Sequence, residues 1–345
     1  MTDDKKTAKP TKVRLGDLAE AAGVSVATVS RALNDHPAIN AETKRRVWKI
    51  ARDLNYAFRP SMPAVLSGSL ATILIVIPTP QGRESNISDP FYLELIGGIG
   101  AAARETRCDM VISHAEPKTE EDLNLLMTEH RTNGVIFLGQ SLLHDRFNRL
   151  ADIEHRFVVW GADLPGQRYC SVGSDNVHGG RRATSHLLRL GRRRIAFMGY
   201  STEALEVHQR YQGYVEALAE QGIAVDSELV LPTHFEVESA EAAIRRLLTK
   251  GIEFDGIVAA SDLIAKGAIR GLMTAGRTVP GDVSVVGYDD IPLARYSRPS
   301  ITTISQNMRT AGRLLVSKLL DSPDGQPMLS ERMPTELIVR ESCGA

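Results

Sequence analysis

The sequence predicts a small all-α domain followed by a large two-lobed α/β body with parallel sheets, and three observations predict it. Helical patterns of apolar residues occupy residues 15–54, whereas short apolar runs alternate with amphipathic segments from residue 71 onward. Residues 1–60 carry a net charge of +5, from twelve Lys and Arg against seven Asp and Glu, which leaves −6 for the other 285 residues. At 345 residues the chain is long enough for a minor domain and a larger core-forming one. The basic domain indicates a polyanionic partner for that domain alone.

The first domain has the spacing of a helix–turn–helix. Apolar residues share one helix face over residues 15–22 and another over residues 29–33, and Gly23 lies between them, where a tight turn needs a residue without a Cβ. Ser25 can cap the second helix, and Asn40 can cap a third helical pattern. In such a unit the second helix presents its first residues to the major groove of DNA.

The second helix carries the side chains that we expect to touch DNA. Val26, Ala27 and Arg31 fall on the side opposite the apolar face and should point outward. Arg31 can make a bidentate contact to guanine, and the two apolar side chains can touch a thymine methyl group. Short polar groups suited to phosphate oxygens are Ser25, Thr28, Ser30 and Asn34. The alternative is a three-helix bundle without a DNA function, which leaves an exposed valine at a helix start unexplained.

A linker separates the two domains. Residues 59–70 contain Pro60, Pro63 and Gly68 and no long apolar stripe. Beyond it, the apolar runs that we predict as strands are 73–77, 110–112, 135–138, 157–160, 195–198, 257–260 and 283–286. The helical segments between them are 91–106, 177–190, 211–221, 239–250 and 263–275. Apolar strands separated by amphipathic helices indicate parallel sheets covered on both faces, and this many units indicates two lobes.

Polar and aromatic side chains follow the ends of these predicted strands, where doubly wound sheets bind ligands. An arginine and an acid make strong hydrogen bonds to hydroxyl groups, and aromatic rings cover the C–H face of a sugar. We therefore expect a polyhydroxylated ligand in a cleft. The six candidate residues are Phe91, Tyr92, Trp160, Arg210, Ser261 and Asp289.

Some of these residues have alternative roles. Asp289 and Asp290 look like a catalytic carboxylate pair, but adjacent residues on a loop rarely aim at one point, so we expect one to bind ligand and the other to cap. Asp175 and Asp262 precede helices and are expected to be N-caps. The two aromatic residues at 91–92 have the alternative of packing in a lobe core. Residues 97–100 are glycine-rich but lie within a helical stretch, which makes them weak evidence for a phosphate site.

The motifs resemble the lactose-repressor (LacI/GalR) family. The pattern V-x-x-x-D-L-A-x-x-A-G-V-S-x-x-T-V-S-R-x-L-N starts at Val13, and T-x-x-x-V and L-N-Y follow it up to Tyr56. Matching body segments are D-P-F-Y (89–92), V-G-S-D-N (172–176), R-Y-Q-G-Y (210–214), A-S-D (260–262), V-S-V-V-G-Y-D-D (283–290) and P-S-I-T-T-I (299–304). The resemblance covers nearly everything from residue 13 to the end of the chain.

This resemblance implies a helix–turn–helix headpiece at residues 11–58, a hinge linker at 59–70 and a periplasmic-binding-protein-like (type I) body at 71–343. The first lobe would comprise 71–174 and 304–331, and the second 175–303 and 332–343, joined by three crossovers. Val26, Ala27 and Arg31 would be the base readers, and Tyr56 would lie near the linker and the DNA backbone. The effector would touch Arg210, Asp289 and Ser261; the serine replaces an asparagine that is common in the family.

In the family the hinge folds on operator DNA and a paired leucine enters the minor groove, where wedging unstacks a base step. This chain departs from the family pattern, because residues 60–66 lack the usual arginine and contain an extra proline. Leu66 is our candidate for the wedge, with Val65 second.

Other function classes find less support. The sequence has no G-x-S-x-G, Walker, G-x-G-x-x-G or H-E-x-x-H motif, and its nine histidines show no metal-ligand spacing. Three widely spaced cysteines fit a reducing cytoplasm. An extracytoplasmic sugar receptor is disfavoured because the first residues lack an apolar secretory segment, and the longest apolar run, 73–77, is too short to span a bilayer. We expect a cytoplasmic protein without a metal or cofactor and without a membrane partner.

The expected function is therefore that of a non-enzymatic, sequence-specific transcriptional regulator, a repressor of carbohydrate-utilisation genes that a sugar or glycoside relieves. Two alternatives stay open: a co-repressor-dependent regulator of the purine type, and a cleft enzyme fused to a DNA-binding head. Two copies would place two heads on the half-sites of a near-palindromic double-stranded operator. The chain ends at Ala345 without the leucine-heptad tail of some family members, so we expect a homodimer.

Overall fold

The computed structural model describes residues 15–33, 39–54, 71–78, 87–129, 132–140, 143–199, 204–320 and 328–345. The chain divides into two compact units, a headpiece up to Ser69 and a body from Leu70 onward, and each is described by itself. None of the described helices is long and apolar enough to cross a membrane.

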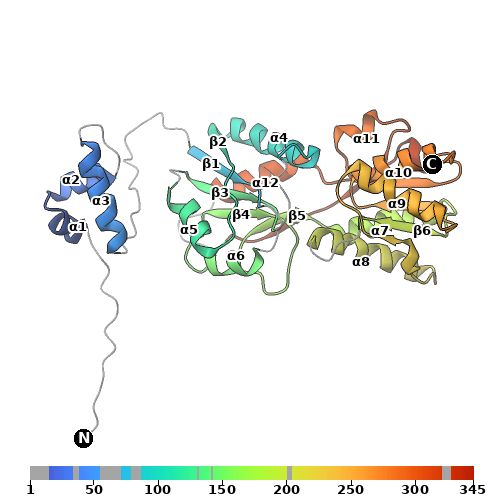
Figure 1. Ribbon diagram of the computed structural model, residues 1–345, viewed down its shortest axis with the longest axis horizontal. Helices are drawn as coiled ribbons and strands as arrows, with labels where there is room; N and C mark the ends of the chain where they lie inside the picture. The colour runs from blue at the N-terminus through green and yellow to red at the C-terminus, as the bar shows by residue number, and fades with distance from the viewer. Residues whose placement is uncertain are drawn as a thin grey trace, which may run out of the picture. The chain divides into compact units, whose positions relative to one another are not determined.

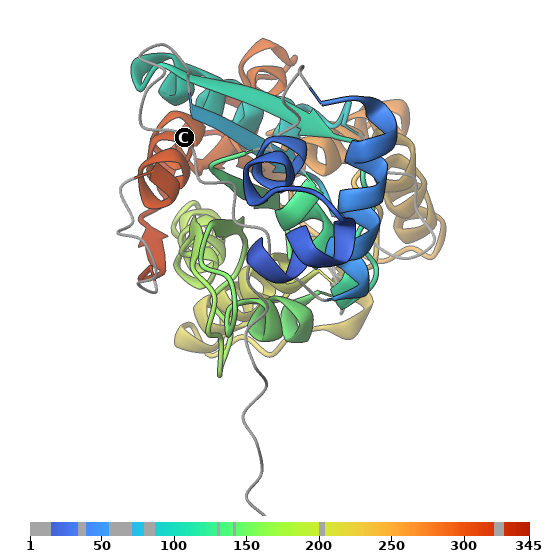
Figure 2. The ribbon, with the colours of Figure 1, turned by 90° about the vertical axis from the view of Figure 1, so that its left-hand side faces the viewer.

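The headpiece contains three helices, α1 (Leu15–Ala22), α2 (Val26–Leu33) and α3 (Ala41–Asp53), drawn in blue in Figure 2. Their apolar faces meet in one core of Leu18, Ala19, Ala22, Val29, Ala32, Leu33, Val47 and Ala51. Gly23 has a φ of +64°, the left-handed conformation that the turn between α1 and α2 requires. Asn40 accepts a hydrogen bond from the Thr43 amide at 2.8 Å, which confirms it as the cap of α3.

The first lobe of the body is built on a six-stranded sheet whose described pairs are all parallel (Figure 1). The strand order is β11 (Glu331–Met333), β5 (Ser171–Ser174), β4 (Phe157–Trp160), β3 (Gly134–Leu138), β1 (Ala71–Val76) and β2 (Cys108–Ser113). Ile73 and Ile75 of β1 pack into one buried cluster with α4 (Pro90–Glu105) and α12 (Met308–Leu320). Leu74 and Val76 pack into another with α5 (Glu120–Glu129) and α6 (His144–Leu150). Both faces are covered, as the continuous apolar run predicts.

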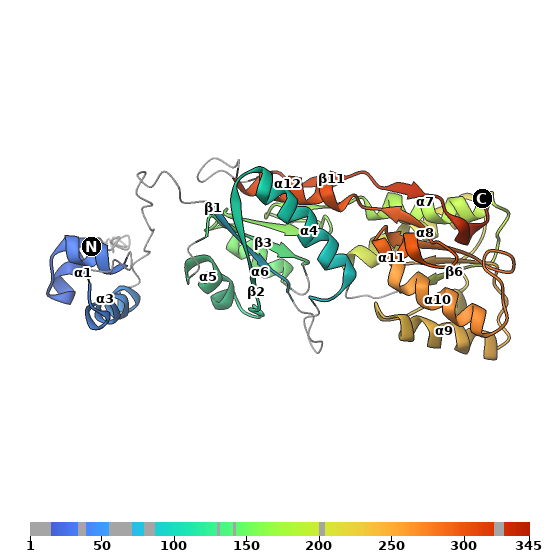
Figure 3. The same ribbon diagram turned by 90° about the horizontal axis from the view of Figure 1, so that it is seen from above.

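Helices α4 and α12 lie side by side although they are far apart in sequence, as Figures 1 and 3 show. A Cβ on Gly98 would collide with the Met308 carbonyl, and a Cβ on Gly312 would collide with the Gly98 backbone. Within the glycine-rich stretch at 97–100, Gly98 therefore serves helix packing, which needs a close backbone approach here.

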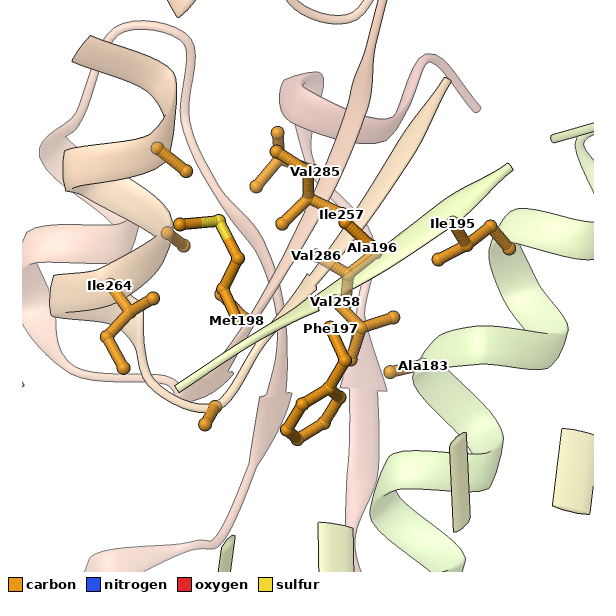
Figure 4. Packing of buried hydrophobic residues seen from close by; sticks show 14 of the residues in the cluster. Ala183, Ile195, Ala196, Phe197, Met198, Ile257, Val258, Ile264, Val285 and Val286 are labelled. Carbon is orange, nitrogen blue, oxygen red and sulfur yellow. The ribbon is translucent and has the colours of Figure 1, made fainter. Parts of the chain in front are cut away.

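The second lobe contains another six-stranded sheet, in the order β12 (Glu336–Ile338), β10 (Thr302–Ser305), β9 (Ser284–Asp289), β8 (Gly256–Ala259), β6 (Ile195–Met198) and β7 (Val230–Leu231). Only β12 is antiparallel to its neighbour among the described pairs. The helices of this lobe are α7 (Asn176–Arg189), α8 (Leu205–Glu220), α9 (Val237–Thr249), α10 (Asp262–Thr274) and α11 (Pro292–Tyr296), with 3-10 turns at Ser227–Leu229 and Glu341–Cys343. Figure 4 shows Met198 pointing toward Ile264 of α10, and Phe197 toward Ala183 of α7, so neighbouring residues of β6 face opposite layers.

The chain passes between the lobes three times, as the resemblance implies. The passages run from β5 into α7, from β10 into α12 and from β11 into β12. The predicted boundary at 174/175 agrees with the structure, and the other two boundaries each differ by two residues. Thr303, Ile304 and Ser305 pair with the β9 and β12 strands of the second sheet, whereas Arg332 and Met333 pair with β5 of the first.

Two further sequence-based expectations were wrong in detail. The predicted helix at 211–221 begins six residues earlier, at Leu205, so Arg210 lies inside α8 rather than at its start. Strands β5 and β10 were not predicted, because their sequences S-V-G-S and T-T-I-S are too polar to give an apolar run. Both strands are nonetheless almost wholly buried, since groups elsewhere in the protein satisfy their hydroxyl groups. Thr302 Oγ1, for example, donates to the Arg340 carbonyl and accepts from the Arg340 amide.

Candidate nucleic-acid interface and interlobe site

One face of α2 is exposed although it carries an apolar side chain. Val26 is 50% exposed, and Ala27 and Arg31 are also exposed, while Val29 and Leu33 on the opposite face are buried. Arg31 forms no ion pair with any residue that the structure describes. The prediction that these three side chains point outward is confirmed. A free guanidinium beside two small apolar groups matches the chemistry of base edges and thymine methyl groups.

The start of α2 is fixed by Ser25. Its Oγ accepts a hydrogen bond from the Thr28 amide at 3.1 Å and lies 2.8 Å from Thr28 Oγ1, which confirms the predicted cap. Ser25 is exposed, and Thr28 and Ser30 are half-buried. The other residues predicted to contact DNA, Asn34, Tyr56 and Leu66, lie outside the described residues, as do Val65 and the hinge linker at 59–70.

The body brings Arg210 and Asp289 together at the carboxyl end of the second sheet. Arg210 Nη1 lies 3.7 Å from Asp289 Oδ1, and each residue is 6% exposed. Arg210 is fixed on three further sides: Nε donates to Asn176 Oδ1 at 2.9 Å, Nη1 donates to the Ala260 carbonyl at 2.5 Å, and the guanidinium lies 3.8 Å from the centre of the Tyr288 ring. The arginine is therefore rigid before any ligand arrives.

Asp289 sits under electrostatic and backbone strain. Burial raises the pKa of its carboxyl to about 7, against the opposing effects of Arg210 and of a hydrogen bond from Gln306, and the charge of Asp89 adds to the rise. The bond from Gln306 Nε2 reaches Oδ1 at 2.6 Å. The backbone of Asp289 has a φ of +108°, a conformation that residues with a side chain rarely adopt. A carboxylate held this way can exchange poor solvation for hydrogen bonds from ligand hydroxyl groups.

Ser261, rather than Asp262, takes the capping role at the start of α10. Ser261 is the N-cap of α10 and accepts a hydrogen bond from the Ile264 amide at 3.2 Å. Asp262 is fully buried behind it, with Oδ1 accepting from Thr303 Oγ1 at 2.6 Å and Oδ2 from the Ile291 amide at 2.9 Å. Burial raises its pKa well above the ordinary range, and the charge of Asp289 adds to the rise. The N-cap prediction is wrong for Asp262, which instead fixes the chain after Asp289.

Two other aspartates can also be placed. Asp175 caps α7, accepting a hydrogen bond from the His178 amide at 3.0 Å, as predicted. Asp290 was expected to cap if Asp289 binds ligand, but it caps no helix in the described structure. It forms an ion pair with Arg340 at 2.6 Å instead.

Three aromatic candidates lie together in the first lobe. The ring of Phe91 is 5.5 Å from that of Tyr92 and 6.3 Å from that of Trp160, between ring centres. Trp160 is buried in the core between the sheet and helices α4 and α12, and the two residues at the start of α4 are half-buried against that core. Asp89 caps α4 through the Phe91 amide at 2.9 Å. Core packing therefore accounts for Trp160 and for the buried parts of Phe91 and Tyr92. The exposed parts of Phe91 and Tyr92 are the surface left for a ligand.

The three aromatic residues belong to the edge of the first lobe that faces the second lobe, and Arg210 and Asp289 belong to the facing edge of the second lobe. Gln209 of α8 donates to the Asp163 carbonyl of the first lobe at 3.1 Å. Burial raises the pKa of Tyr92, and the charges of Glu206 in the second lobe and Asp89 in the first add to that rise. We call the set Phe91, Tyr92, Trp160, Arg210, Ser261 and Asp289 the interlobe site.

Three further residues, which support the interlobe site, were not predicted from the sequence. Asn176, Tyr288 and Gln306 hold Arg210 and Asp289, and Gln306 also accepts a hydrogen bond from Ser174 of the first lobe at 2.7 Å. The first two lie within the motifs V-G-S-D-N and V-G-Y-D-D, which gave a signal for them. Gln306 had none, because it follows a strand that was not predicted. Among the described residues, no three His, Cys, Asp or Glu side chains gather as a metal site would need.

Known proteins share both units of this chain. The profile of bacterial regulatory proteins, lacI family, matches residues 14–58, and that of the periplasmic binding protein-like domain matches residues 184–343. The HTH-type transcriptional regulator CelR of Thermobifida fusca is 32% identical over 333 residues, covering 94% of this chain and 96% of its own. The HTH-type transcriptional repressor CytR of Escherichia coli is 32% identical over 345 residues, 97% of either chain. A solved CelR–cellobiose complex superposes with a TM-score of 0.67 at 29% identity, over 96% of this chain and 99% of that one.

Proposed function

The chain belongs to the lacI family of bacterial regulatory proteins, and we propose that it represses carbohydrate-utilisation genes until a sugar-like effector binds its body. The observation that carries the proposal is the pairing of Arg210 with Asp289, both buried at the carboxyl end of the second sheet, because a charged pair held in this way suits the hydroxyl groups of a polyhydroxylated ligand. A CelR that is 29% identical to this chain has been solved as a complex with cellobiose.

For the headpiece, we propose residues 11–58 as the DNA-binding unit and 59–70 as the hinge. Val26, Ala27 and Arg31 read base edges, while Ser25, Thr28, Ser30 and Asn34 contact phosphates. Tyr56 lies near the linker and the DNA backbone, and Leu66 wedges into the minor groove of the operator. The exposure of the three base readers on one helix face supports the first assignment.

For the body, residues 71–343, we propose that the effector bridges the lobes. Arg210 and Asp289 bond its hydroxyl groups, Ser261 lies beside them, and Phe91, Tyr92 and Trp160 cover its apolar faces. The rigid support of Arg210 favours this role, because a preorganised group loses little freedom when the ligand binds.

We propose that the chain regulates without catalysing a reaction. The carboxyl group that Asp289 would need as a partner in acid–base chemistry is that of Asp262, and both of its oxygens already accept hydrogen bonds within the protein. The regulator would act in the cytoplasm, where its DNA target lies, as a homodimer whose two headpieces occupy two half-sites.

In this mechanism the effector acts through the relative arrangement of the lobes. Each lobe carries part of the site, so a ligand that bonds both favours one arrangement over the other. The change would reach the hinge segments of the dimer and lower operator affinity, through a coupling of about 1–3 kcal/mol, typical of such systems.

The test uses the full-length protein and an operator duplex obtained by in-vitro selection. We expect selection of a near-palindromic site, and a measurable loss of operator affinity when cellobiose or another neutral sugar from a panel is added. Calorimetry on the full chain should show the same sugar binding directly. Operator binding that a sugar tightens would contradict relief by an inducer, and failure to select any duplex would contradict the headpiece assignment.

A further inference from the structure

The last described turn of the chain is bonded to the start of strand β9 and to Ser300, which lies shortly before β10. Ser342 Oγ donates to the Val285 carbonyl at 2.6 Å, and Glu341 Oε2 accepts from Ser300 Oγ at 2.9 Å. The Cys343 carbonyl accepts from Ser284 Oγ at 2.8 Å. The 340–343 segment therefore ties the start of strand β9 to the residues that precede β10.

Arg340 reaches furthest within this segment. Its backbone amide donates to Thr302 Oγ1 at 2.8 Å, Nη1 donates to the Ile301 carbonyl at 2.8 Å, and Nη2 donates to Asp290 Oδ1 at 2.6 Å. The two side chains of this ion pair are only 15% and 23% exposed. The guanidinium thus joins Ile301, the residue before β10, directly to the turn at 289–290.

That turn has a backbone that its residue types disfavour. Asp289 and Asp290 are consecutive aspartates with φ values of +108° and +60°. Such conformations persist only where the surroundings enforce them. On one side the turn is held by Asp262, which accepts from the Ile291 amide. On the other side it is held by Arg340 through Asp290.

We propose that Arg340 is a positioning residue of the interlobe site: by holding Asp290 it keeps the turn in its left-handed form and so aims the Asp289 carboxyl at Gln306 and Arg210. The proposal rests on the proposed function only in calling this carboxyl an effector contact. Arg340 touches no ligand in it; it acts through the adjacent residue.

The proposal makes a prediction about the acidity of Asp289. The charged or titratable groups that surround this carboxyl are Arg210 of α8, Asp89 at the start of α4, Asp262 of α10, Tyr288 of β9, and Asp290 with Arg340. Burial dominates and raises its pKa to about 7. If the turn relaxes, the carboxyl gains solvent and its pKa should fall toward 3.8. Loss of a nearby positive charge alone would instead raise the pKa, so the direction separates positioning from charge.

The experiment follows the Asp289 carboxyl by 13C NMR in the full-length chain with labelled aspartate, and Asp289→Asn identifies the resonance by its loss. In Arg340→Gln we expect the titration midpoint to fall by at least about one pH unit, and Arg340→Lys should restore part of the shift. If Arg340→Gln fails to fold, Arg340→Lys decides the matter. It keeps the positive charge but loses one of the two side-chain bonds of Arg340, so its midpoint should still lie below that of the unmodified protein, and an unchanged midpoint would overturn the proposal.

The matched control is Glu341→Gln, which removes the charge that Ser300 contacts and leaves the turn untouched. Its midpoint should equal that of the unmodified protein. An unchanged or higher midpoint in Arg340→Gln, or an equal fall in Glu341→Gln, would overturn the proposal. Calorimetry with cellobiose is a separate measurement. A shifted midpoint without sugar binding would keep the positioning role and reject the sugar assignment, whereas sugar binding with an unshifted midpoint would do the reverse.

Discussion

The headpiece and the second lobe place their candidate residues in opposite surroundings. Val26, Ala27 and Arg31 are exposed neighbours on one helix, and Arg31 is unpaired among the described residues. Arg210 and Asp289 are buried, come from different elements and depend on each other. From this difference we expect that a substitution on the exposed face of α2 leaves stability unchanged, whereas a substitution of Arg210 or Asp289 disturbs the second lobe.

Salt should separate the two regions most strongly. Operator affinity should fall by about 10³-fold between about 50 and 200 mM salt if roughly six phosphate contacts are made, because binding releases counterions from DNA. Effector affinity should change by less than about threefold, since the buried Arg210 and Asp289 are poorly screened. Fluorescence anisotropy and calorimetry measure the two values. Equal salt dependence at both sites would break the comparison.

Replacement of Arg210 by alanine should affect both binding and stability. Asp289 would be left buried without its cation, a loss of about 3 kcal/mol that should shrink at pH 6, where the carboxyl can protonate. Effector binding should be abolished in calorimetry, while operator binding is retained. The control is Arg181→Ala, which breaks an ion pair to Glu220 with both side chains nearly half exposed and should cost little. Retained effector binding by Arg210→Ala would count against the site.

Replacement of Arg31 by alanine should change DNA recognition alone. We expect a loss of about 1–3 kcal/mol on the selected operator, with base preference relaxed at one position of each half-site. The unfolding temperature should not change, because the side chain is exposed. A binding-selection assay reads the preference. Lys49→Ala, on exposed surface of α3, should leave base preference unaltered, and an unaltered preference in Arg31→Ala as well would refute its role.

The affinity for the effector should also depend on pH, and we expect the change for each pH unit to be smaller than the effects of the substitutions above. Effector hydroxyl groups bond best to ionised Asp289, whose pKa is about 7, so affinity should fall by about tenfold for each pH unit below that value and level off above it. Proton release on binding should appear in calorimetry with two buffers. The slope should disappear in Asp289→Asn.

The same group should also affect folding stability. Because its pKa is raised in the folded state from the ordinary 3.8, the stability linked to it is fully present below 3.8 and is lost as pH rises toward 7. Thermal unfolding of Asp289→Asn should lack that decline, and an identical decline in both proteins would show that other groups cause it.

Local features of the sequence were enough for the headpiece. Apolar spacing gave all three helices, and the caps at Ser25 and Asn40 and the turn at Gly23 need only neighbouring residues. In the body, continuous apolar runs gave seven strands, but β5 and β10 were hidden, because buried hydroxyl groups such as those of Ser174 and Thr303 find partners far along the chain.

The interlobe site was only partly predictable for the same reason. The residue types of Arg210 and Asp289 indicated ligand chemistry, but the groups that fix them come from α7, β9 and the passage after β10. The role of Asp262 was misjudged because sequence shows a helix start and not the partners of both carboxyl oxygens. Such pairings appear only once the sheet is assembled.

The passages between the lobes are very short. They consist of Asp175 alone, of Gln306 with Asn307, and of Pro334 with Thr335. Because the three connections are this short, the lobes can neither separate nor rotate independently of one another. Any rearrangement must be a rotation that all three connections allow. Proline allows almost no change of its own φ, and Asn307 already sits at a φ of +50°. The two lobes therefore have very few relative motions available, and a ligand that changes the conformation of these three connections must rotate each lobe as a rigid unit.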